Sequence, residues 1–220
     1  MLNETMDIKD FVNKTRRDYL KKKLNRETAK ENPFEQFEIW FAEAIESQIF
    51  EPNAMTLATA NKGGMPSARV VLLRGFDEEG FTFFTNYDSR KGLDLAENPQ
   101  ACLLFYWAEI ERQVRLEGLI SKVGEEISDS YFATRPRESQ IGAWVSPQSE
   151  RIENREVLEQ RFAELTAKWE GKEIARPPNW GGYILQPQAF EFWQGRAGRL
   201  HDRLFYTKSE TGWKIERLAP

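Results

Sequence analysis

The strongest constraint on the fold is a series of short segments with a two-residue period, each ended by a turn signal. Residues 54–60, 67–75 and 81–86 read AMTLATA, SARVVLLRG and FTFFTN, with NKGGMP and DEEG between them. The runs ACLLFYWA and QVRLEGLISKV continue the pattern across a short polar turn at 109–112. Such segments with short connections are typical of antiparallel strands. The sequence therefore predicts a mainly β fold, an antiparallel barrel.

Helical patterns flank this β region. Asn32 is a candidate N-cap before Pro33, and apolar side chains recur at helical spacing from Phe34 to about Ser47. Further helices are expected at 125–136, 137–146 and about 149–171, and RPPNWGG ends them. Four more strands should close the chain: GYILQP, AFEFWQG, RLFYTK and GWKIERL. We expect the helices to pack around the barrel.

Composition excludes several classes of protein. The chain has 220 residues, 40% of them hydrophobic, which suits one domain of generous size. We predict a single domain over 32–220, preceded by a polar and basic arm at 1–31. The net charge of −4 argues against nucleic acid or an anionic membrane as the main partner. No apolar run approaches the roughly 20 residues that span a membrane, so no membrane partner is expected.

The cysteine and histidine content argues against disulfide bonds and metal sites. Cys102, the single cysteine, cannot form an internal disulfide, and its place in ACLLFYW indicates a core residue. No signal pattern opens the chain, and the cytoplasm is the expected compartment. One histidine and one cysteine give no usual cluster of metal ligands. We therefore expect no metal site.

The stretch Phe190–Arg203, FEFWQGRAGRLHDR, holds the single histidine, His201. Glycines at 195 and 198 mark a turn. In an alternating backbone beyond it, Arg199, His201 and Arg203 share one face. That face would be cationic and rich in hydrogen-bond donors, which suits an anionic planar ligand. A histidine beside an aspartate is also typical of an ordinary surface residue, so this pattern alone leaves both interpretations open.

Three further patterns fit anion binding, and each has a plainer interpretation. Arg69 and Arg74 bracket four apolar residues, as in a buried strand with charged ends. Ser89 is a candidate helix start, followed by Arg90 and Lys91, and backbone amides at the start of a helix favour anions. The plainer interpretation is a solvated basic turn. Finally, a phenol, a guanidinium and a hydroxyl match the acceptor oxygens of a phosphate. Tyr131 and Arg135 share one face of an expected helix, and Ser139 lies just beyond it. The plainer interpretation is that Tyr131 is a core residue and Arg135 a surface residue.

The stretch FEFWQGRAGRLHDR closely resembles the C-terminal signature of the pyridoxamine 5'-phosphate oxidase family, flavoenzymes that make pyridoxal 5'-phosphate. The resemblance runs from about Thr15 to Pro220. It implies a split β-barrel of the FMN-binding type and a homodimer with FMN at the subunit interface. It also implies oxidation of pyridoxamine 5'-phosphate and pyridoxine 5'-phosphate, with oxygen as acceptor and hydrogen peroxide as a product.

The resemblance also implies residue roles. Arg199 and His201 would be catalytic and hold the pyridine ring of the substrate over the flavin. The implied substrate-binding residues are Arg16, Arg17, Asp18, Tyr19, Arg74, Tyr131, Arg135, Ser139, Arg199, Leu200 and His201. The implied FMN-binding residues are Arg69, Val70, Val71, Leu72, Leu73, Arg74, Phe84, Thr85, Arg90, Lys91, Gln113, Gln148, Ser149, Trp193 and Arg203.

This sequence departs from the family pattern at three of these positions. The family commonly has Lys at the position of Arg74, and often Tyr at Phe84 and Glu at Asp18. The segment 16–19 resembles one that covers the substrate, so the arm is a candidate lid. Two alternatives stay open: a split-barrel flavoprotein with another substrate, such as a flavin reductase, and a small β-barrel that binds single-stranded nucleic acid.

Overall fold

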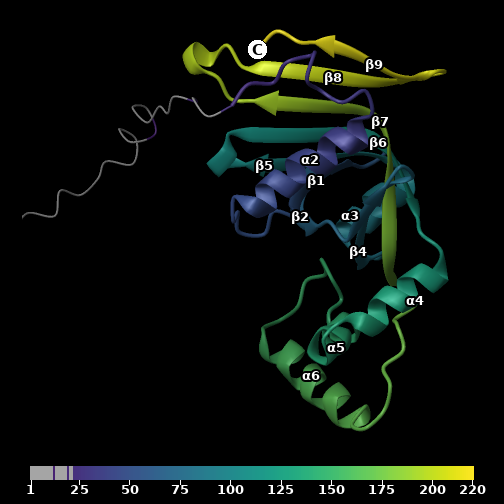
Figure 1. The fold of residues 1–220 in the computed structure, drawn as a ribbon. Coiled ribbons are helices and arrows are strands. Elements are labelled where there is room, and N and C mark those ends of the chain that lie inside the picture. The colour runs from purple at the N-terminus through teal and green to yellow at the C-terminus, as the bar shows by residue number, and fades with distance from the viewer. Residues whose placement is uncertain (1–11, 13–18, 20–21) are drawn as a thin grey trace, which may run out of the picture.

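The structure is a computed structural model that describes Val12, Tyr19 and residues 22–220. Its main feature is a curled nine-stranded sheet in which every pairing is antiparallel (Figure 1). The strands are β1 (Ala54–Ala60), β2 (Pro66–Leu72), β3 (Gly75–Asp77), β4 (Gly80–Asn86), β5 (Gln100–Trp107), β6 (Arg112–Lys122), β7 (Trp180–Gln194), β8 (Asp202–Ser209) and β9 (Gly212–Arg217). Their order is β2-β1-β5-β6-β7-β4-β3, and β8 pairs with both β7 and β9. The predicted antiparallel β architecture is confirmed.

Strand β7 is the longest and ties the sheet together. It pairs with β6 along its length, with β4 through its first half and with β8 through its second. The prediction of four closing strands is wrong, because GYILQP and AFEFWQG form this one strand of 15 residues. Pro187 is tolerated where the β6 register shifts at Gly118. A Cβ on Gly118 would lie 2.1 Å from the carbonyl oxygen of Gln186, so glycine permits the close approach.

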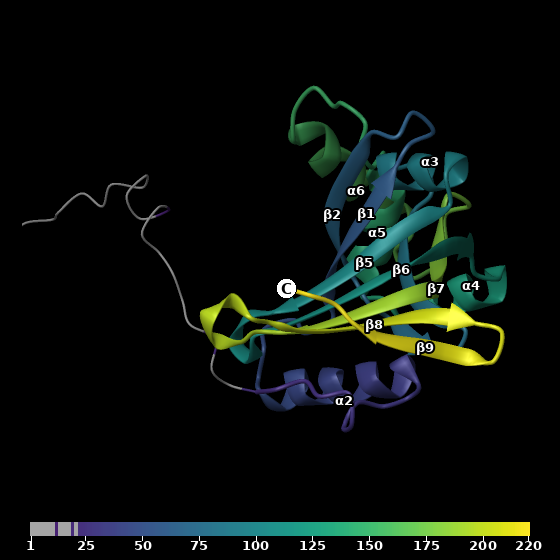
Figure 2. The same ribbon diagram turned by 90° about the horizontal axis from the view of Figure 1, so that it is seen from above.

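Helix α2 (Pro33–Glu46) lies along one face of the sheet (Figure 2). It begins as predicted, with the Asn32 side chain accepting a hydrogen bond from the Phe34 N–H at 2.9 Å. Its buried face includes Phe37, whose ring lies 4.8 Å from that of Phe81 in the sheet. Leu24, from the predicted arm, is buried in the same core. The described end of the arm therefore packs against the sheet.

Three helices form a separate layer at one end of the sheet (Figure 1). They are α4 (Glu125–Thr134), α5 (Arg137–Val145) and α6 (Glu156–Lys168), close to the predicted segments although α6 is shorter. A second apolar core lies here and includes Phe132, Ile141 and Trp180, the first residue of β7. Among the described residues no helix is long and apolar enough to cross a membrane.

Two short 3₁₀ turns and one helix complete the fold: η1 (Ala108–Ile110), η2 (Ala197–Arg199) and α3 (Arg90–Glu97). Ser89 caps α3, as predicted, by accepting a hydrogen bond from the backbone of Gly92. Cys102 is half-buried and alternates along β5 with core residues such as Leu103. The prediction that it is a core residue is therefore wrong. Burial raises the pKa of its thiol to about 11, which leaves it protonated and unreactive at neutral pH.

Candidate functional site

A cavity of about 290 Å³ lies where β2, β4, α3, α4 and the start of β7 meet. We call it the cationic cavity. Its lining residues are Val70, Val71, Leu72, Arg74, Phe84, Thr85, Lys91, Tyr131, Arg135, Gln148 and Trp180. All of them except Trp180 are site residues that the sequence predicted. Residues that are up to 110 positions apart in the chain, Val70 and Trp180, thus line one space.

Lys91 is the buried cation at one side of this cavity. Its ammonium donates to the Thr85 hydroxyl (3.1 Å), the Ser89 hydroxyl (3.0 Å) and the Gln148 side-chain oxygen (2.7 Å). No carboxylate of the described residues forms an ion pair with it. Burial, and secondly the nearby charge of Arg69, lower the pKa of Lys91 to about 8. A desolvated ammonium with neutral partners is a natural site for an anion.

Arg69 adds a second charge beside Lys91. Its guanidinium donates to the Leu57 carbonyl (3.1 Å), the Thr59 hydroxyl (2.8 Å) and the Ser67 hydroxyl (2.7 Å). Burial lowers the pKa of Arg69, the nearby Asp94 raises it, and the charge of Arg90 lowers it again. Arg69, Arg90 and Lys91 therefore lie within electrostatic reach of one another, near the N-terminus of α3.

Arg135 is the cation at the other side of the cavity. It follows the last residue of α4, and its Nη1 is buried without a hydrogen-bond partner. Burial lowers the pKa of Arg135; the Tyr131 phenol opposes this shift and the charge of Arg74 adds to it. Buried polar atoms without partners are rare in native proteins. This orphaned donor fits an anion that enters the cavity beside Arg74 and Tyr131.

A second cluster lies near the other end of β7, and we call it the signature cluster: Tyr19, Trp193 and His201. The rings of Trp193 and His201 are 4.7 Å apart, and Tyr19 lies 5.6 Å from the first and 5.7 Å from the second. Nδ1 of His201 accepts a hydrogen bond from the Arg196 N–H at 3.1 Å. Burial and the charge of Arg199 lower the pKa of His201. This lowered pKa favours the neutral imidazole, and because Nδ1 accepts a hydrogen bond, its proton is on Nε2.

The predicted common face of Arg199, His201 and Arg203 is wrong. Arg199 ends the 3₁₀ turn η2 with a φ of 60°, and β8 begins only at Asp202. The strand alternation on which that prediction rested does not reach Arg199. Arg203 instead donates to the Glu191 carboxylate (2.7 Å) and to the Ala219 carbonyl (2.7 Å).

The remaining predicted residues lie around these two groups. Gln113 faces Trp193 across β6 and β7, and Leu200 is exposed beside His201. Ser139 lies in the first turn of α5, and Ser149 has a φ of 76° in the loop after it. Leu73 is buried after β2. Arg16, Arg17 and Asp18 lie outside the described residues.

The two groups are far apart in a single chain. Trp180 begins β7 and Trp193 is its penultimate residue, and this strand bends as it runs from the junction with the helical layer to the part of the sheet that pairs with β8 (Figure 1). Thirteen residues of strand cover roughly 40 Å along the chain, and no residue that lines the cationic cavity belongs to the signature cluster. One copy of the chain therefore presents two half-sites, the cationic cavity and the signature cluster.

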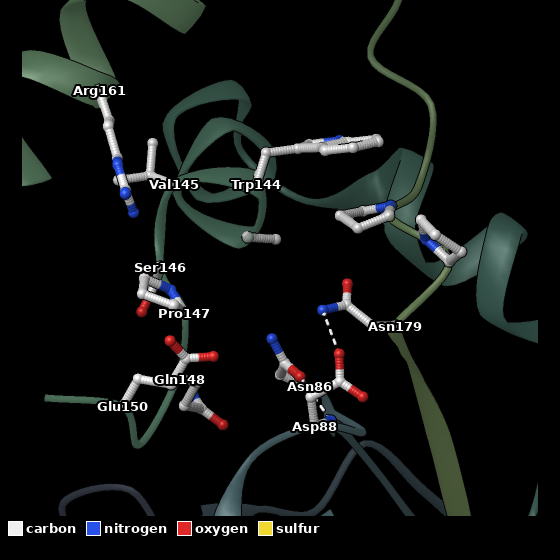
Figure 3. A pocket seen from close by; sticks show the side chains of 13 residues that line it. Asn86, Asp88, Trp144, Val145, Ser146, Pro147, Gln148, Glu150, Arg161 and Asn179 are labelled. Atoms are coloured by element: carbon white, nitrogen blue, oxygen red, sulfur yellow. Dashed lines mark hydrogen bonds between the residues drawn. The ribbon is translucent and has the colours of Figure 1, made fainter.

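Another cavity, of about 430 Å³, lies between α5 and the loop before β7 (Figure 3). It has side chains of both charges, Asp88, Glu150 and Arg161, and Asp88 accepts a hydrogen bond from Asn179 at 2.8 Å. Of the residues that the structure describes, Gln148 alone lines both cavities. The larger cavity therefore lacks the group of cations that marks the smaller one.

Sequence reasoning missed Trp180. It stands in RPPNWGG, where proline and glycine hide any periodic signal. Its one clue was an aromatic residue two positions before a predicted strand. In the structure it is 6% exposed and packs against both the sheet and the helical layer.

Comparisons with known proteins agree with this geometry. Residues 41–169 match the family model described as pyridoxamine 5'-phosphate oxidase, and residues 180–220 match the pyridoxine 5'-phosphate oxidase C-terminal dimerisation region. The chain is 58% identical over 208 residues to a pyridoxine/pyridoxamine 5'-phosphate oxidase of Burkholderia mallei, covering 93% of this chain and 97% of that one. A protein of the same name from Nostoc punctiforme is also 58% identical, over 206 residues, with 93% and 96% covered.

Solved structures show the same fold. PhzG from Burkholderia lata 383, in complex with tetrahydrophenazine-1-carboxylic acid, has a TM-score of 0.84 and 34% identity, covering 90% of this chain and 98% of that one. An FMN-binding protein related to pyridoxamine 5'-phosphate oxidase, from Nostoc punctiforme, has a TM-score of 0.67 at 19% identity, covering 84% and 97%. The second likeness supports the split-barrel fold alone.

Proposed function

Because the chain belongs to the pyridoxamine 5'-phosphate oxidase family, we propose that it oxidises pyridoxamine 5'-phosphate and pyridoxine 5'-phosphate to pyridoxal 5'-phosphate. The observation that carries this proposal is a pair of cations in one cavity, the buried Lys91 and the half-buried Arg135 with its buried Nη1, without carboxylate partners among the described residues. Two phosphorylated ring compounds, a cofactor and a substrate, would supply the two missing anions.

FMN fits the Lys91 side of the cavity. Arg69, Arg90 and Lys91 would hold its phosphate at the start of α3, and the loss of solvent around Lys91 strengthens that contact. Thr85 and Gln148 line the same space and would contact the flavin. When bound, FMN supplies the two-electron acceptor that the protein's own side chains lack, and passes the electrons to oxygen.

The substrate phosphate fits the Arg135 side. Arg74 and Arg135 would bind its oxygens as charged donors, with the Tyr131 and Ser139 hydroxyls as neutral ones. Arg74 stands where the family commonly has Lys, and a guanidinium can hold two phosphate oxygens at once. The buried Nη1 of Arg135 then gains the partner that it lacks in the free chain.

We propose that a homodimer joins the two half-sites. The match of residues 180–220 to a dimerisation region supports this, since the signature cluster lies in that segment apart from Tyr19. Gln113, Trp193 and Arg203 of one chain would then contact FMN held by the other. Arg199, Leu200 and His201 would contact the substrate, with residues 16–19 as a lid over it.

His201 and Arg199 would act directly at the substrate ring. Nε2 of the neutral His201 carries a proton that it can donate to a ring substituent, while Nδ1 stays fixed by the Arg196 N–H. Arg199 would stabilise negative charge on the pyridine ring and its oxygen substituent. Arg199→Ala should therefore lower turnover while FMN stays bound, and normal turnover in that variant would reject its role.

The overall reaction has a simple balance. Pyridoxamine 5'-phosphate, oxygen and water give pyridoxal 5'-phosphate, ammonia and hydrogen peroxide. Pyridoxine 5'-phosphate needs no water and releases no ammonia. The test is to purify the protein, identify any released flavin, and measure peroxide formed with each substrate. A colourless protein that binds no FMN, or a flavoprotein that forms no peroxide with either compound, would reject the proposal.

PhzG supports a second candidate, a flavoenzyme that acts on a carboxylated ring system, because that relative was solved with tetrahydrophenazine-1-carboxylic acid. Phosphate dependence separates the two. A charged hydrogen bond contributes about 1.5–3 kcal/mol, so our proposal predicts that pyridoxine 5'-phosphate binds orders of magnitude more tightly than pyridoxine. Equal affinities would favour the second candidate.

A further inference from the structure

Trp180 belongs to a cluster of nearly parallel aromatic rings at the Arg135 side of the cationic cavity. Phe84 and Tyr131 stack with centroids 3.9 Å apart and an interplanar angle of 17°. Trp180 lies 5.6 Å from Phe84 at 13° and 6.2 Å from Tyr131 at 5°. We call these three residues the ring cluster. Because β4, α4 and β7 contribute one ring each, the cluster joins the sheet to the helical layer.

The ring cluster has two guanidinium neighbours. The Arg135 guanidinium carbon lies 4.5 Å from the centroid of Trp180, and that of Arg74 lies 5.9 Å from the centroid of Tyr131. A second ring, Phe132, lies 5.6 Å from the same Arg135 carbon. Trp180 therefore makes the shorter of the two aromatic contacts to Arg135. Indole is also the ring that attracts cations most strongly.

Nothing of opposite charge among the described residues holds Arg135. It forms no ion pair there, its Nη1 is buried without a hydrogen-bond partner, and its charge is partly desolvated beside the like charge of Arg74. A flexible arginine in this position would turn away toward water. The contact with the Trp180 ring is the shorter of its two aromatic contacts and favours a guanidinium that stays in the cavity.

Trp180 is itself rigidly placed. The residue is 6% exposed, and its carbonyl accepts a hydrogen bond from Arg176 at 2.7 Å. The next residue, Gly181, packs so closely that a Cβ there would lie 2.2 Å from the Tyr87 hydroxyl oxygen. The indole therefore has a fixed backbone position from which to hold another side chain.

From these contacts we infer that Trp180 is a positioning residue for the substrate phosphate: it holds the Arg135 guanidinium in its binding position before the substrate arrives. This inference rests on the proposed function. A guanidinium that packs its face on a ring keeps its in-plane N–H groups for acceptor oxygens. Pre-ordering of this kind improves affinity because less side-chain freedom is lost on binding.

The test compares Trp180→Leu and Trp180→Phe with the wild-type FMN-loaded dimer. Trp144→Leu is the matched control, since that indole lines the other cavity and its Nε1 donates to the Ala175 carbonyl. In Trp180→Leu we expect the KM for pyridoxamine 5'-phosphate to rise about tenfold, as loss of a desolvated cation–ring contact implies. We expect kcat, the FMN dissociation constant and inhibition by unphosphorylated pyridoxine to change less than twofold. Trp180→Phe should fall between, and Trp144→Leu should match the wild type.

A folded Trp180→Leu protein with the wild-type KM would overturn the inference. So would a parallel loss of affinity for FMN and pyridoxine, which would indicate a general structural role. If the leucine variant does not fold, Trp180→Phe supplies the same comparison: a raised KM for the phosphorylated substrate alone supports the inference, and an unchanged KM overturns it.

Calorimetric titration with inorganic phosphate separates this inference from the proposed function. If the wild-type protein oxidises neither pyridoxamine 5'-phosphate nor pyridoxine 5'-phosphate, the proposed function fails. In the FMN-loaded protein, phosphate binding that weakens about tenfold in the Trp180 variant would still support the role of the indole. Equal phosphate binding in both proteins would overturn it.

Discussion

Replacing Lys91 with methionine should make the FMN-free protein more stable and its binding of FMN weaker. The ammonium of Lys91 is buried, and its pKa falls from 10.5 to about 8. A shift of this size corresponds to about 3 kcal/mol of destabilisation when the group is charged. Methionine removes the charge but leaves the oxygens of Thr85, Ser89 and Gln148 without their donor. We therefore expect a net gain of about 1–2 kcal/mol in the free energy of unfolding at pH 7.

The pH dependence has a definite sign. The unfolded chain binds the Lys91 proton up to its ordinary pKa of 10.5, and the folded chain only up to about 8. The penalty is therefore fully present below pH 8 and disappears as the pH rises to 10.5. Between pH 8 and pH 10.5 the free energy of unfolding of the FMN-free wild-type protein should therefore rise with pH. Lys91→Met should lack this contribution to the rise.

FMN binding should show the opposite dependence. A phosphate beside Lys91 favours the charged amine, so the wild-type affinity should be about tenfold weaker at pH 9 than at pH 7. Lys91→Met should bind FMN at least tenfold more weakly at pH 7, since it loses a charged hydrogen bond of about 1.5–3 kcal/mol. Its affinity should also depend less on pH.

The assays are urea unfolding of FMN-free protein and titration of FMN fluorescence, both from pH 7 to pH 10. Lys62→Met is the control, because Lys62 is an exposed lysine in the turn between β1 and β2. Wild-type stability and wild-type FMN affinity in Lys91→Met would together refute the assignment of Lys91 as a desolvated phosphate ligand.

Three other predictions follow from single contacts. Arg135→Met should raise the KM for pyridoxamine 5'-phosphate at least tenfold in steady-state kinetics; a parallel loss of pyridoxine binding would contradict its assignment to the phosphate. Gly118→Ala should lower the free energy of unfolding by about 2–4 kcal/mol in urea, because its Cβ would meet the Gln186 carbonyl at 2.1 Å; Gly124→Ala, with open space around it, is the control. Glu191→Gln should lower the free energy of unfolding by about 3 kcal/mol, since this buried carboxylate pairs with two arginines; an unchanged urea midpoint would contradict this.

Features set by neighbouring residues could be predicted from the sequence. Asn32 and Ser89 cap α2 and α3 as expected, because a cap depends on the few residues that follow it. Strand β7 could not be predicted as one strand, since Pro187 reads as a break. Only the register shift at Gly118 on the neighbouring strand makes room for it.

The candidate site likewise has features that could be predicted from the sequence and features that could not. Motif residues such as Lys91 and Arg135 do line one cavity, but sequence patterns alone could not bring them together, because side-chain contacts between β4, α3 and α4 create it. Arg199 was misplaced because a 3₁₀ turn interrupts the alternation. Trp180 was missed because its role depends on the distance from its ring to Arg135, which no local pattern encodes.

The central claim is that two chains complete each site, with the cationic cavity from one and the signature cluster from the other. Complementation tests it directly. With substrate below the wild-type KM, the Arg135→Met and Arg199→Ala proteins should each have little activity alone. After the two are unfolded together and refolded, half of the dimers should be mixed, and one of the two sites in each mixed dimer should have both arginines. We predict about a quarter of wild-type peroxide formation with pyridoxamine 5'-phosphate; activity no higher than that of the separate variants, with mixed dimers present, would contradict the account.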